Sequence, residues 1–364
     1  MIRHLYIHIP FCHHICPYCA FYKHQPGSLA NRTFVNSILE EARISAGEFE
    51  VQPETIFFGG GTPSLLSPTL ITLLCEGLRD IFDLSKIREW TLESNPATFD
   101  LKKARLFRDL GITRPSLGVQ SFHPRTLSTL GRDHSADEAD EAFRILGESG
   151  FDNVSIDLMF SIPGQSLQDW ESDLRHAIAL NPSHISCYNL TYEEDTEFMQ
   201  RHKKGELDAN EDRDADAFYL ALSLLEQNGF AHYEISNYAR PGFESLHNQA
   251  YWSGSDYLGL GPGAVSTVTN IRWKNLPDTA GYTRAVLDGK SVKTEVEHLT
   301  DEDRRIEAIA LQLRTAKGLP TGYIDGLYPV DSLTQQGLIV KKGDRYCLTY
   351  EGKALADPIS ASLV

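Results

Sequence analysis

The chain has 364 residues, of which 41% are hydrophobic and 23% charged, a composition in the ordinary range of water-soluble globular proteins. Its formal net charge of −16 disfavours nonspecific binding to nucleic acid or to anionic membranes, because both require clustered Lys and Arg. Six cysteines without a paired pattern, and no apolar run long enough for a signal peptide or a membrane span, indicate a cytoplasmic protein without stable membrane insertion.

The first predicted element is a short apolar strand over residues 4–9, and an unusual loop follows it. The loop carries Cys12, Cys16 and Cys19 in a C-x3-C-x2-C pattern. Three thiolates without a fourth can bind three irons of a cubane 4Fe-4S cluster and leave one iron open. This spacing resembles the cluster loop of radical S-adenosylmethionine (SAM) enzymes, in which SAM caps the open iron and is cleaved to a 5'-deoxyadenosyl radical.

The same loop permits a second interpretation. Three cysteines with His8, His13 and His14 nearby are also compatible with a tetrahedral zinc site of the Cys3His type. We expect these histidines to be solvated loop residues rather than ligands, which favours the cluster. The remaining cysteines stand far apart among apolar or aromatic neighbours, and we predict that they are small core residues. They are Cys75, Cys187 and Cys347.

Strands and helices alternate over the first 230 residues. Further strands are predicted over residues 54–58, 89–92, 114–119, 153–159 and 184–190. Helices are predicted over residues 30–47, 69–82, 101–110, 136–149 and 167–180. Six strand–helix units imply a parallel sheet of the α/β class. Because a closed barrel needs eight units, we expect an open, partial (β/α)6 TIM-like barrel with a lateral mouth.

Polar residues stand where these strands end. A glycine-rich run, residues 59–64, follows the second strand, while Glu93, Gln120 and Asp157 lie at or near the ends of the next three. Carboxyl ends of parallel strands share one edge, where active sites are built. Glycines let the backbone approach a ligand, and Arg132 can bind a carboxylate through its planar fork. Each residue alone could form a turn, a cap or a surface ion pair, but their shared location favours a binding site.

The pattern changes in the last third of the chain. After a predicted helix over residues 210–227, a connecting segment with a glycine-rich stretch occupies residues 231–282. A charged helical region over residues 301–315 and short strand-like pieces ending at residues 345–349 then predict a smaller helical, winged-helix-like domain. We therefore divide the chain into residues 1–230, 231–282 and 283–364.

Several segments carry a resemblance to a known family. Residues 6–12, 58–64, 116–122 and 131–135 resemble the oxygen-independent coproporphyrinogen III oxidase superfamily of radical SAM proteins. Residues 232–239, and an H-N-x-x-Y-W element at residues 247–252, are similar to its HemW branch of heme chaperones. The resemblance runs from about residue 3 to residue 320.

This resemblance implies a radical SAM barrel with a HemN-like carboxyl-terminal domain, a protein that binds heme and transfers it to apo-hemoproteins. It implies that Cys12, Cys16 and Cys19 bind the 4Fe-4S cluster. The residues implied for one or two SAM positions are Tyr6, Tyr18, Gly60, Gly61, Thr62, Glu93, Gln120, Arg132 and Asp157.

His247 is the candidate heme ligand, because a neutral imidazole suits iron and the nearby Tyr251 and Trp252 offer flat apolar surface for a macrocycle. The alternative is that His247 caps a turn and that the aromatic rings fill the core.

Two other activities remain open on the same scaffold. An anaerobic coproporphyrinogen III oxidase would remove carboxylates from propionate side chains, and a methyltransferase would use a second SAM as methyl donor. The oxidases carry a further Cys where this chain has Phe21, and a long segment ahead of the cluster where Cys12 here is almost at the amino terminus. The H-N-x-x-Y-W element favours the chaperone.

Overall fold

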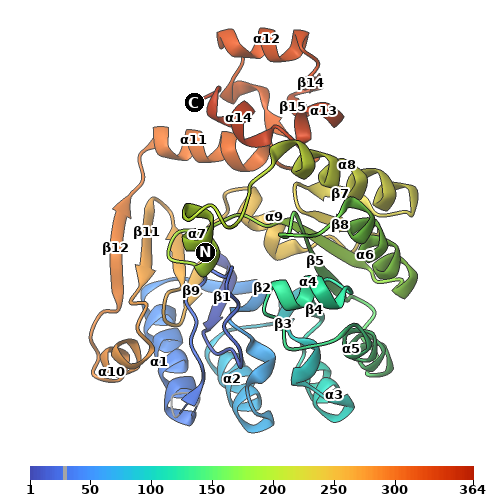
Figure 1. The fold of residues 1–364 in the computed structure, drawn as a ribbon. Coiled ribbons are helices and arrows are strands. Elements are labelled where there is room, and N and C mark those ends of the chain that lie inside the picture. The colour runs from blue at the N-terminus through green and yellow to red at the C-terminus, as the bar shows by residue number, and fades with distance from the viewer. Residues whose placement is uncertain (28–30) are drawn as a thin grey trace.

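The computed structural model describes residues 1–27 and 31–364, and its centre is a curved sheet of nine strands. Six of them run parallel in the order of the chain: β1 (Ile2–Ile9), β2 (Val51–Gly60), β3 (Glu89–Ser94), β4 (Arg114–Gln120), β5 (Ser155–Phe160) and β6 (His184–Asn189). The helices that follow them are α1 (Arg32–Glu48), α2 (Pro68–Ile81), α3 (Leu101–Asp109), α4 (Pro124–Thr129), α5 (Ala136–Glu148), α6 (Leu167–Leu180), α7 (Glu197–Lys203) and α8 (Glu211–Gln227). Figure 1 shows the longer helices in a layer outside the sheet.

Three further strands extend the sheet at its two ends. β7 (Ala231–Glu234) and β8 (Asn237–Ala239) are antiparallel to their neighbours and follow β6, whereas β9 (Leu258–Leu260) pairs parallel with β1. The strand order is β7-β8-β6-β5-β4-β3-β2-β1-β9, and no pairing joins β7 to β9 in the described part of the chain. The predicted open α/β barrel is therefore confirmed.

The strands alternate between an apolar outer face and a polar inner face. On β1, Leu5 and Ile7 are fully buried in the main apolar cluster, with residues of α1 and α2, while His4 and His8 alternate with them. The helices begin where the sequence supplies caps. Ser135 and Ser166 each form a capping box with the acidic residue three positions later. The position at which each helix begins is thus specified by local sequence, and the packing of the helices on the sheet depends on the apolar outer face of the strands.

The carboxyl-terminal third contains two smaller sheets. The remaining elements are α9 (Leu246–Trp252), β10 (Val265–Val268), β11 (Ile271–Asn275), α10 (Thr279–Leu287), β12 (Lys293–His298), α11 (Asp301–Gln312), β13 (Leu319–Pro320), α12 (Tyr328–Gln335), β14 (Ile339–Lys342), β15 (Arg345–Leu348), α13 (Tyr350–Lys353) and α14 (Ala356–Ala361). Trp273 and Val292 join the core of the barrel, whereas an apolar cluster from Ile309 to Leu363 forms a core of its own. The smaller unit, with helices around the sheet β13-β15-β14, fits the predicted winged-helix-like domain (Figure 1), and the exact division of the chain stays a prediction.

The sheet β10-β11-β12 was not predicted from the sequence. None of the helices in residues 1–27 and 31–364 has the length and apolar character that crossing a membrane requires.

One buried carboxyl group connects α1 to these later segments. Glu41 accepts hydrogen bonds from the backbone N–H of Gly261 (2.8 Å), from Asn275 Nδ2 (2.6 Å) and from the hydroxyl of Tyr282 (2.5 Å). Burial raises the pKa of Glu41 to about 7, although the hydrogen bonds act in the opposite direction. The folded protein therefore retains a proton on Glu41 at pH values where the unfolded chain has lost it.

Replacing Glu41 by Gln should change how stability depends on pH. As the pH rises from about 5 to about 8, the free energy of unfolding of the wild type should fall by roughly 2 to 3 kcal/mol relative to the variant, because only the unfolded wild-type chain gains the ionised carboxylate readily. Urea unfolding at both pH values measures the difference. Glu40→Gln, which removes the exposed neighbouring carboxylate, is the control. A pH-independent difference between wild type and Glu41→Gln would contradict the raised pKa.

Candidate functional site

The three clustered cysteines lie on the loop that follows β1. Backbone hydrogen bonds close this loop at its base, from the N–H of Cys12 to the carbonyl of His24 (3.1 Å) and from the N–H of His24 to the carbonyl of Pro10 (2.8 Å). Another, from the N–H of Cys19 to the carbonyl of Cys16 (3.2 Å), makes a turn between the second and third cysteines. All three thiols are free and only partly buried, so they are available to a metal group.

The glycine-rich loop after β2 packs directly on the cysteine loop. The N–H of Thr62 donates to the carbonyl of Phe11 (2.7 Å), and the Thr62 hydroxyl lies 3.7 Å from Cys12 Sγ. A Cβ at Gly61 would lie only 2.7 Å from the Phe11 carbonyl oxygen, and Gly60 has a φ of 107° with a histidine ring of β1 against its Cβ position. Glycine is required at both positions by this close approach, so the two loops form one packed unit.

The surroundings of the thiols suit a group that binds several thiolates. Arg132 Nη1 lies 3.8 Å from Cys16 Sγ, and the Lys23 ammonium donates to the carbonyl of Cys19. Burial raises the pKa of Cys12 to about 11 and also raises that of Cys19, so both keep their protons until a metal displaces them. Among the described residues, no three His, Cys, Asp or Glu side chains gather as ligands of one metal ion. A cubane cluster takes one thiolate at each of three irons.

Two partly buried carboxyl groups lie behind the loops on the inner face of the sheet. Asp157 on β5 accepts hydrogen bonds from serine hydroxyls on three adjacent strands, Ser116 (2.8 Å), Ser155 (3.0 Å) and Ser186 (2.7 Å). Glu93 on β3 accepts the backbone N–H of Gly60 (3.2 Å). Burial, and then the charge of Asp157, raise the pKa of Glu93 to about 8. A cation bound beside the pair would be stabilised, because it would let Glu93 ionise.

Arg132 and Gln120 complete this edge of the sheet. Arg132 Nη2 donates to Asn95 Oδ1 (2.7 Å) and to the carbonyl of Gly118 (2.7 Å), which fixes the guanidinium near the cysteine loop. Gln120 ends β4 with a φ of 65°, and its Oε1 is buried without a partner in the described part of the chain. A buried unsatisfied acceptor at a strand end can receive a donor from a ligand. Tyr18 of the cysteine loop lies close to Cys16 and Arg132.

The structure thus brings the predicted cluster residues and most predicted SAM residues to the carboxyl-terminal edge of β1 to β5. Tyr6 lies deeper on β1, where its hydroxyl is hydrogen-bonded to His8 Nδ1 (3.0 Å). His8 itself is buried on the strand, so its description as a solvated loop residue was wrong, whereas His13 and His14 are exposed as expected. The other three cysteines, Cys75, Cys187 and Cys347, are buried, and this prediction is confirmed.

His247 lies away from that edge, on α9, and its side chain is only 1% exposed. Its Nδ1 is hydrogen-bonded to Thr55 Oγ1 (2.8 Å), and its Nε2 is buried without a partner among the described residues. The ring stacks on Phe57 (5.1 Å between centroids) and meets Tyr251 edge-on (4.7 Å). Burial lowers the pKa of His247 to about 3, with smaller contributions from His4 and Arg114, so the imidazole is neutral.

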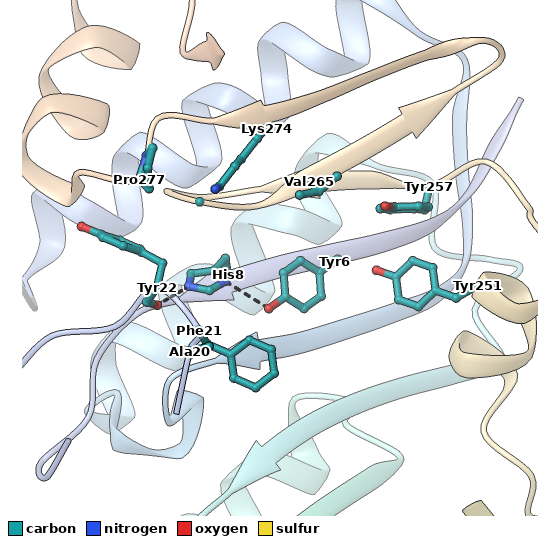
Figure 2. Close-up of a pocket in the computed structure, with 11 residues that line it drawn as sticks. Tyr6, His8, Ala20, Phe21, Tyr22, Tyr251, Tyr257, Val265, Lys274 and Pro277 are labelled. Atoms are coloured by element: carbon teal, nitrogen blue, oxygen red, sulfur yellow. Dashed lines mark hydrogen bonds between the residues drawn. The ribbon is translucent and has the colours of Figure 1, made fainter. Parts of the chain in front are cut away.

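A cavity of about 470 Å³ opens between β1, the end of the cysteine loop and the β10–β11 hairpin. Figure 2 shows its aromatic walls and the ammonium group of Lys274, which projects from the hairpin. The aromatic residues are Tyr6, Phe21, Tyr22, Tyr251 and Tyr257. Sequence analysis did not identify Tyr22, Tyr257 or Lys274, because no local pattern indicates that the hairpin folds against β1. The only local pattern that indicates this cavity is the alternation of Tyr6 and His8 with apolar residues on the first strand, which places both side chains on one face.

Comparisons with known proteins agree with this geometry. The profile of the Radical SAM superfamily matches residues 6–177. The chain is 33% identical over 372 residues to the heme chaperone HemW of Bacillus subtilis (98% of each chain). It is 34% identical over 361 residues to the heme chaperone HemW of Escherichia coli (96% of this chain, 94% of the relative). The solved structure of coproporphyrinogen III oxidase (HemN) from Escherichia coli, a radical SAM enzyme, covers 100% of this chain and 90% of its own with a TM-score of 0.86, and at 22% identity it shares the fold.

Replacing Cys16 by Ser should abolish the brown iron–sulfur chromophore of protein reconstituted anaerobically with iron and sulfide, because a cubane loses one of its three thiolate ligands. Visible absorption together with iron and sulfide analysis measures this. Cys347→Ser, which alters a buried thiol of the carboxyl-terminal unit, is the matched control and should keep the chromophore. Stoichiometric zinc in the wild type, with no chromophore in any variant, would instead support the Cys3His alternative.

Proposed function

From the premise that this chain belongs to the HemW family of heme chaperones, within the radical SAM superfamily, we propose that it binds heme and transfers it to apo-hemoproteins. The observation that carries the proposal is the similarity over nearly the full length of relatives named as heme chaperones. A cytoplasmic location, in which a labile cluster is kept reduced, is part of the same proposal.

The superfamily implies a 4Fe-4S cluster and SAM as cofactors. We assign the cluster to Cys12, Cys16 and Cys19, which share one closed loop with free thiols. When bound, the cluster would supply an electron to SAM at its open iron. The bound SAM would be enclosed on the side of the cysteine loop by Tyr18 and by the glycine-rich loop with Thr62.

The remaining SAM contacts are assigned to polar groups of the sheet edge. Glu93 and Asp157 would balance the positive charge of the sulfonium ligand, since the raised pKa of Glu93 reflects a site short of a cation. Arg132 would receive a carboxylate, because its Nε is buried without a partner in the described chain. Gln120 Oε1, likewise unpartnered, would accept a hydrogen bond from the ligand.

We assign heme to the aromatic cavity of Figure 2 and to the adjoining side of α9 that carries Tyr251 and His247. Tyr251 belongs to both, since it lines the cavity and its ring meets that of His247. His247 has the features of an axial ligand: a neutral ring, one nitrogen oriented by Thr55, and the other without a partner among the described residues. Because His247 is almost fully buried, ligation requires α9 to shift from its observed position.

The oxidase remains the second candidate, supported by the shared fold of HemN. The sequence motif around the cluster differs at one position, because Phe21 stands where the oxidases carry a further cysteine. Its side chain is 69% exposed beside the cavity, where an aromatic ring can contact a flat ligand. This substitution favours binding of a macrocycle over its decarboxylation.

Replacing His247 by Ala should shift the Soret maximum of the heme-loaded protein and weaken heme binding about tenfold or more, because an axial bond to iron is lost. Absorption titration with heme measures both quantities. His232→Ala removes another buried histidine whose pKa burial also lowers to about 3, and it should leave the spectrum unchanged. If His247→Ala has wild-type thermal stability and an unaltered Soret band, the axial ligand is a residue other than His247.

The function itself is tested with the reconstituted full-length protein. Heme-loaded protein mixed with the apo form of a b-type hemoprotein should lose its heme to that recipient, which is followed by absorption and by recovery of recipient activity. In parallel, the protein is incubated anaerobically with SAM, a reductant and coproporphyrinogen III, and products are read by mass spectrometry. We expect no decarboxylated porphyrin. Its formation would make the chain an oxidase, and failure to bind heme at all would overturn the chaperone proposal.

A further inference from the structure

Arg114, at the start of β4, is a buried arginine whose Nε has no hydrogen-bond partner among the described residues. Its side chain is 2% exposed, and its Nε makes no hydrogen bond within residues 1–27 and 31–364. Nor does the guanidinium form an ion pair within 4.0 Å of any carboxylate among those residues. A guanidinium stays protonated at all ordinary pH values, and a buried charge without a counter-ion is strongly unfavourable. The arrangement therefore indicates a place for an anionic group that comes from outside the chain.

A second unpaired donor lies beside it. The strand register pairs Phe57 of β2 with Thr91 of β3, and Thr91 with Arg114 of β4. Thr91 is fully buried, and its hydroxyl has no partner among the described residues. Thr91 and Arg114 therefore stand next to each other in adjacent strands, and each carries an unsatisfied donor.

One carboxylate on the same face of β3 as Thr91 is already engaged. Glu89, two residues before Thr91 on β3, accepts hydrogen bonds from the N-terminus of α9: the hydroxyl of Ser245 (3.2 Å) and the backbone N–H groups of Leu246 (2.8 Å) and His247 (3.0 Å). Burial and then the charge of Arg114 lower the pKa of His184 well below its usual value, so that imidazole is neutral too. Within the described residues, no carboxylate therefore lies within 4.0 Å of the guanidinium of Arg114.

The same row of the sheet leads to the aromatic cavity. Tyr6 pairs with Phe57 in the strand register, so the row Tyr6–Phe57–Thr91–Arg114 crosses four adjacent strands over roughly 14 Å. Tyr6 lines the cavity (Figure 2), and His247, with its free Nε2, stacks on Phe57 in the middle of the row. A flat ligand lying along this row would therefore have an aromatic wall, a free imidazole nitrogen and an arginine in succession.

We propose that Arg114 and Thr91 form a carboxylate subsite on the inner face of the barrel, and that its occupant is a propionate of heme. The proposal rests on the proposed function. A guanidinium fork and a hydroxyl together match the two oxygens of a carboxylate. Heme combines that group with the flat apolar body that suits Tyr6 and Phe57. Access requires the same displacement of α9 that ligation by His247 requires. The carboxylate of SAM has the same chemistry and is the other source to be distinguished.

The experiment compares binding of heme, of heme dimethyl ester and of SAM to the full-length protein, with Arg114→Met, Arg114→Lys and a control. The wild type should bind heme roughly tenfold or more tightly than its dimethyl ester, because esterification removes the negative charge. Arg114→Met should abolish that preference, and Arg114→Lys should restore part of it. The control Arg240→Met, which removes a guanidinium bonded to Asn181 outside the barrel, should behave as wild type. SAM affinity should be unchanged in all variants.

The possible outcomes distinguish failure of the proposed carboxylate subsite from failure of the proposed chaperone function. Equal affinity of the wild type for heme and its dimethyl ester would overturn the subsite while the chaperone function stands. Retention of the preference in Arg114→Met, with thermal unfolding like that of the wild type, would also overturn it. Loss of SAM binding in Arg114→Met, with heme binding unaffected, would assign the carboxylate to SAM and overturn heme as occupant. A wild type that binds neither porphyrin would overturn the proposed function itself.

Discussion

The partly buried carboxylate of Asp157 makes the hydrogen bonds on which the inner face of this barrel depends. It accepts hydrogen bonds from three serine hydroxyls that belong to β4, β5 and β6, so it ties three adjacent strands together on the side opposite their apolar packing. Hydrogen bonds of this kind offset the cost of withdrawing part of a carboxylate from water. Its charge in turn raises the pKa of Glu93. The geometry of the sheet and the electrostatics of its carboxyl-terminal edge therefore have a common origin.

The same polar layer continues from that edge to α9. Ser155, which donates to the carboxylate, is also hydrogen-bonded to His184 Nδ1 (2.8 Å), and His184 Nε2 is hydrogen-bonded to the Tyr233 hydroxyl (2.9 Å). That hydroxyl accepts the N–H of Ser245 (3.3 Å), whose side chain donates to Glu89 (3.2 Å). Hydrogen bonds in a low-dielectric interior polarise one another. Asp157, which is assigned to the SAM site, and the helix assigned to heme thus belong to one connected network.

Sequence alone predicted the parts of this arrangement that are local in the chain. The cysteine loop, the strand–helix alternation and the polar strand ends are contiguous patterns, and the open barrel follows from counting six units. The role of Glu89 could not be predicted, because its partners on α9 lie more than 150 residues away. The pairing of β9 with β1, and the folding of the β10–β11 hairpin over Tyr6, are equally non-local. The prediction that His8 is a solvated loop residue is wrong, because His8 alternates with apolar residues on the first strand. That alternation is typical of a residue on the inner face of the sheet.

The inner face of the barrel has one region that would be stabilised by a cation and another that would be stabilised by an anion. Two separate ligands account for these two regions better than one ligand does. At the carboxyl-terminal edge, Glu93 keeps its proton because of burial and Asp157, so the region gains from a cation. Deeper in the barrel, Arg114 Nε and the Thr91 hydroxyl are donors without acceptors in the part of the chain that the structure describes, so that region gains from an anion. SAM carries a sulfonium that suits the first region, and heme carries propionates that suit the second. A single fold can hold both because β3 and β4 contribute residues to each, at different depths of the same inner face.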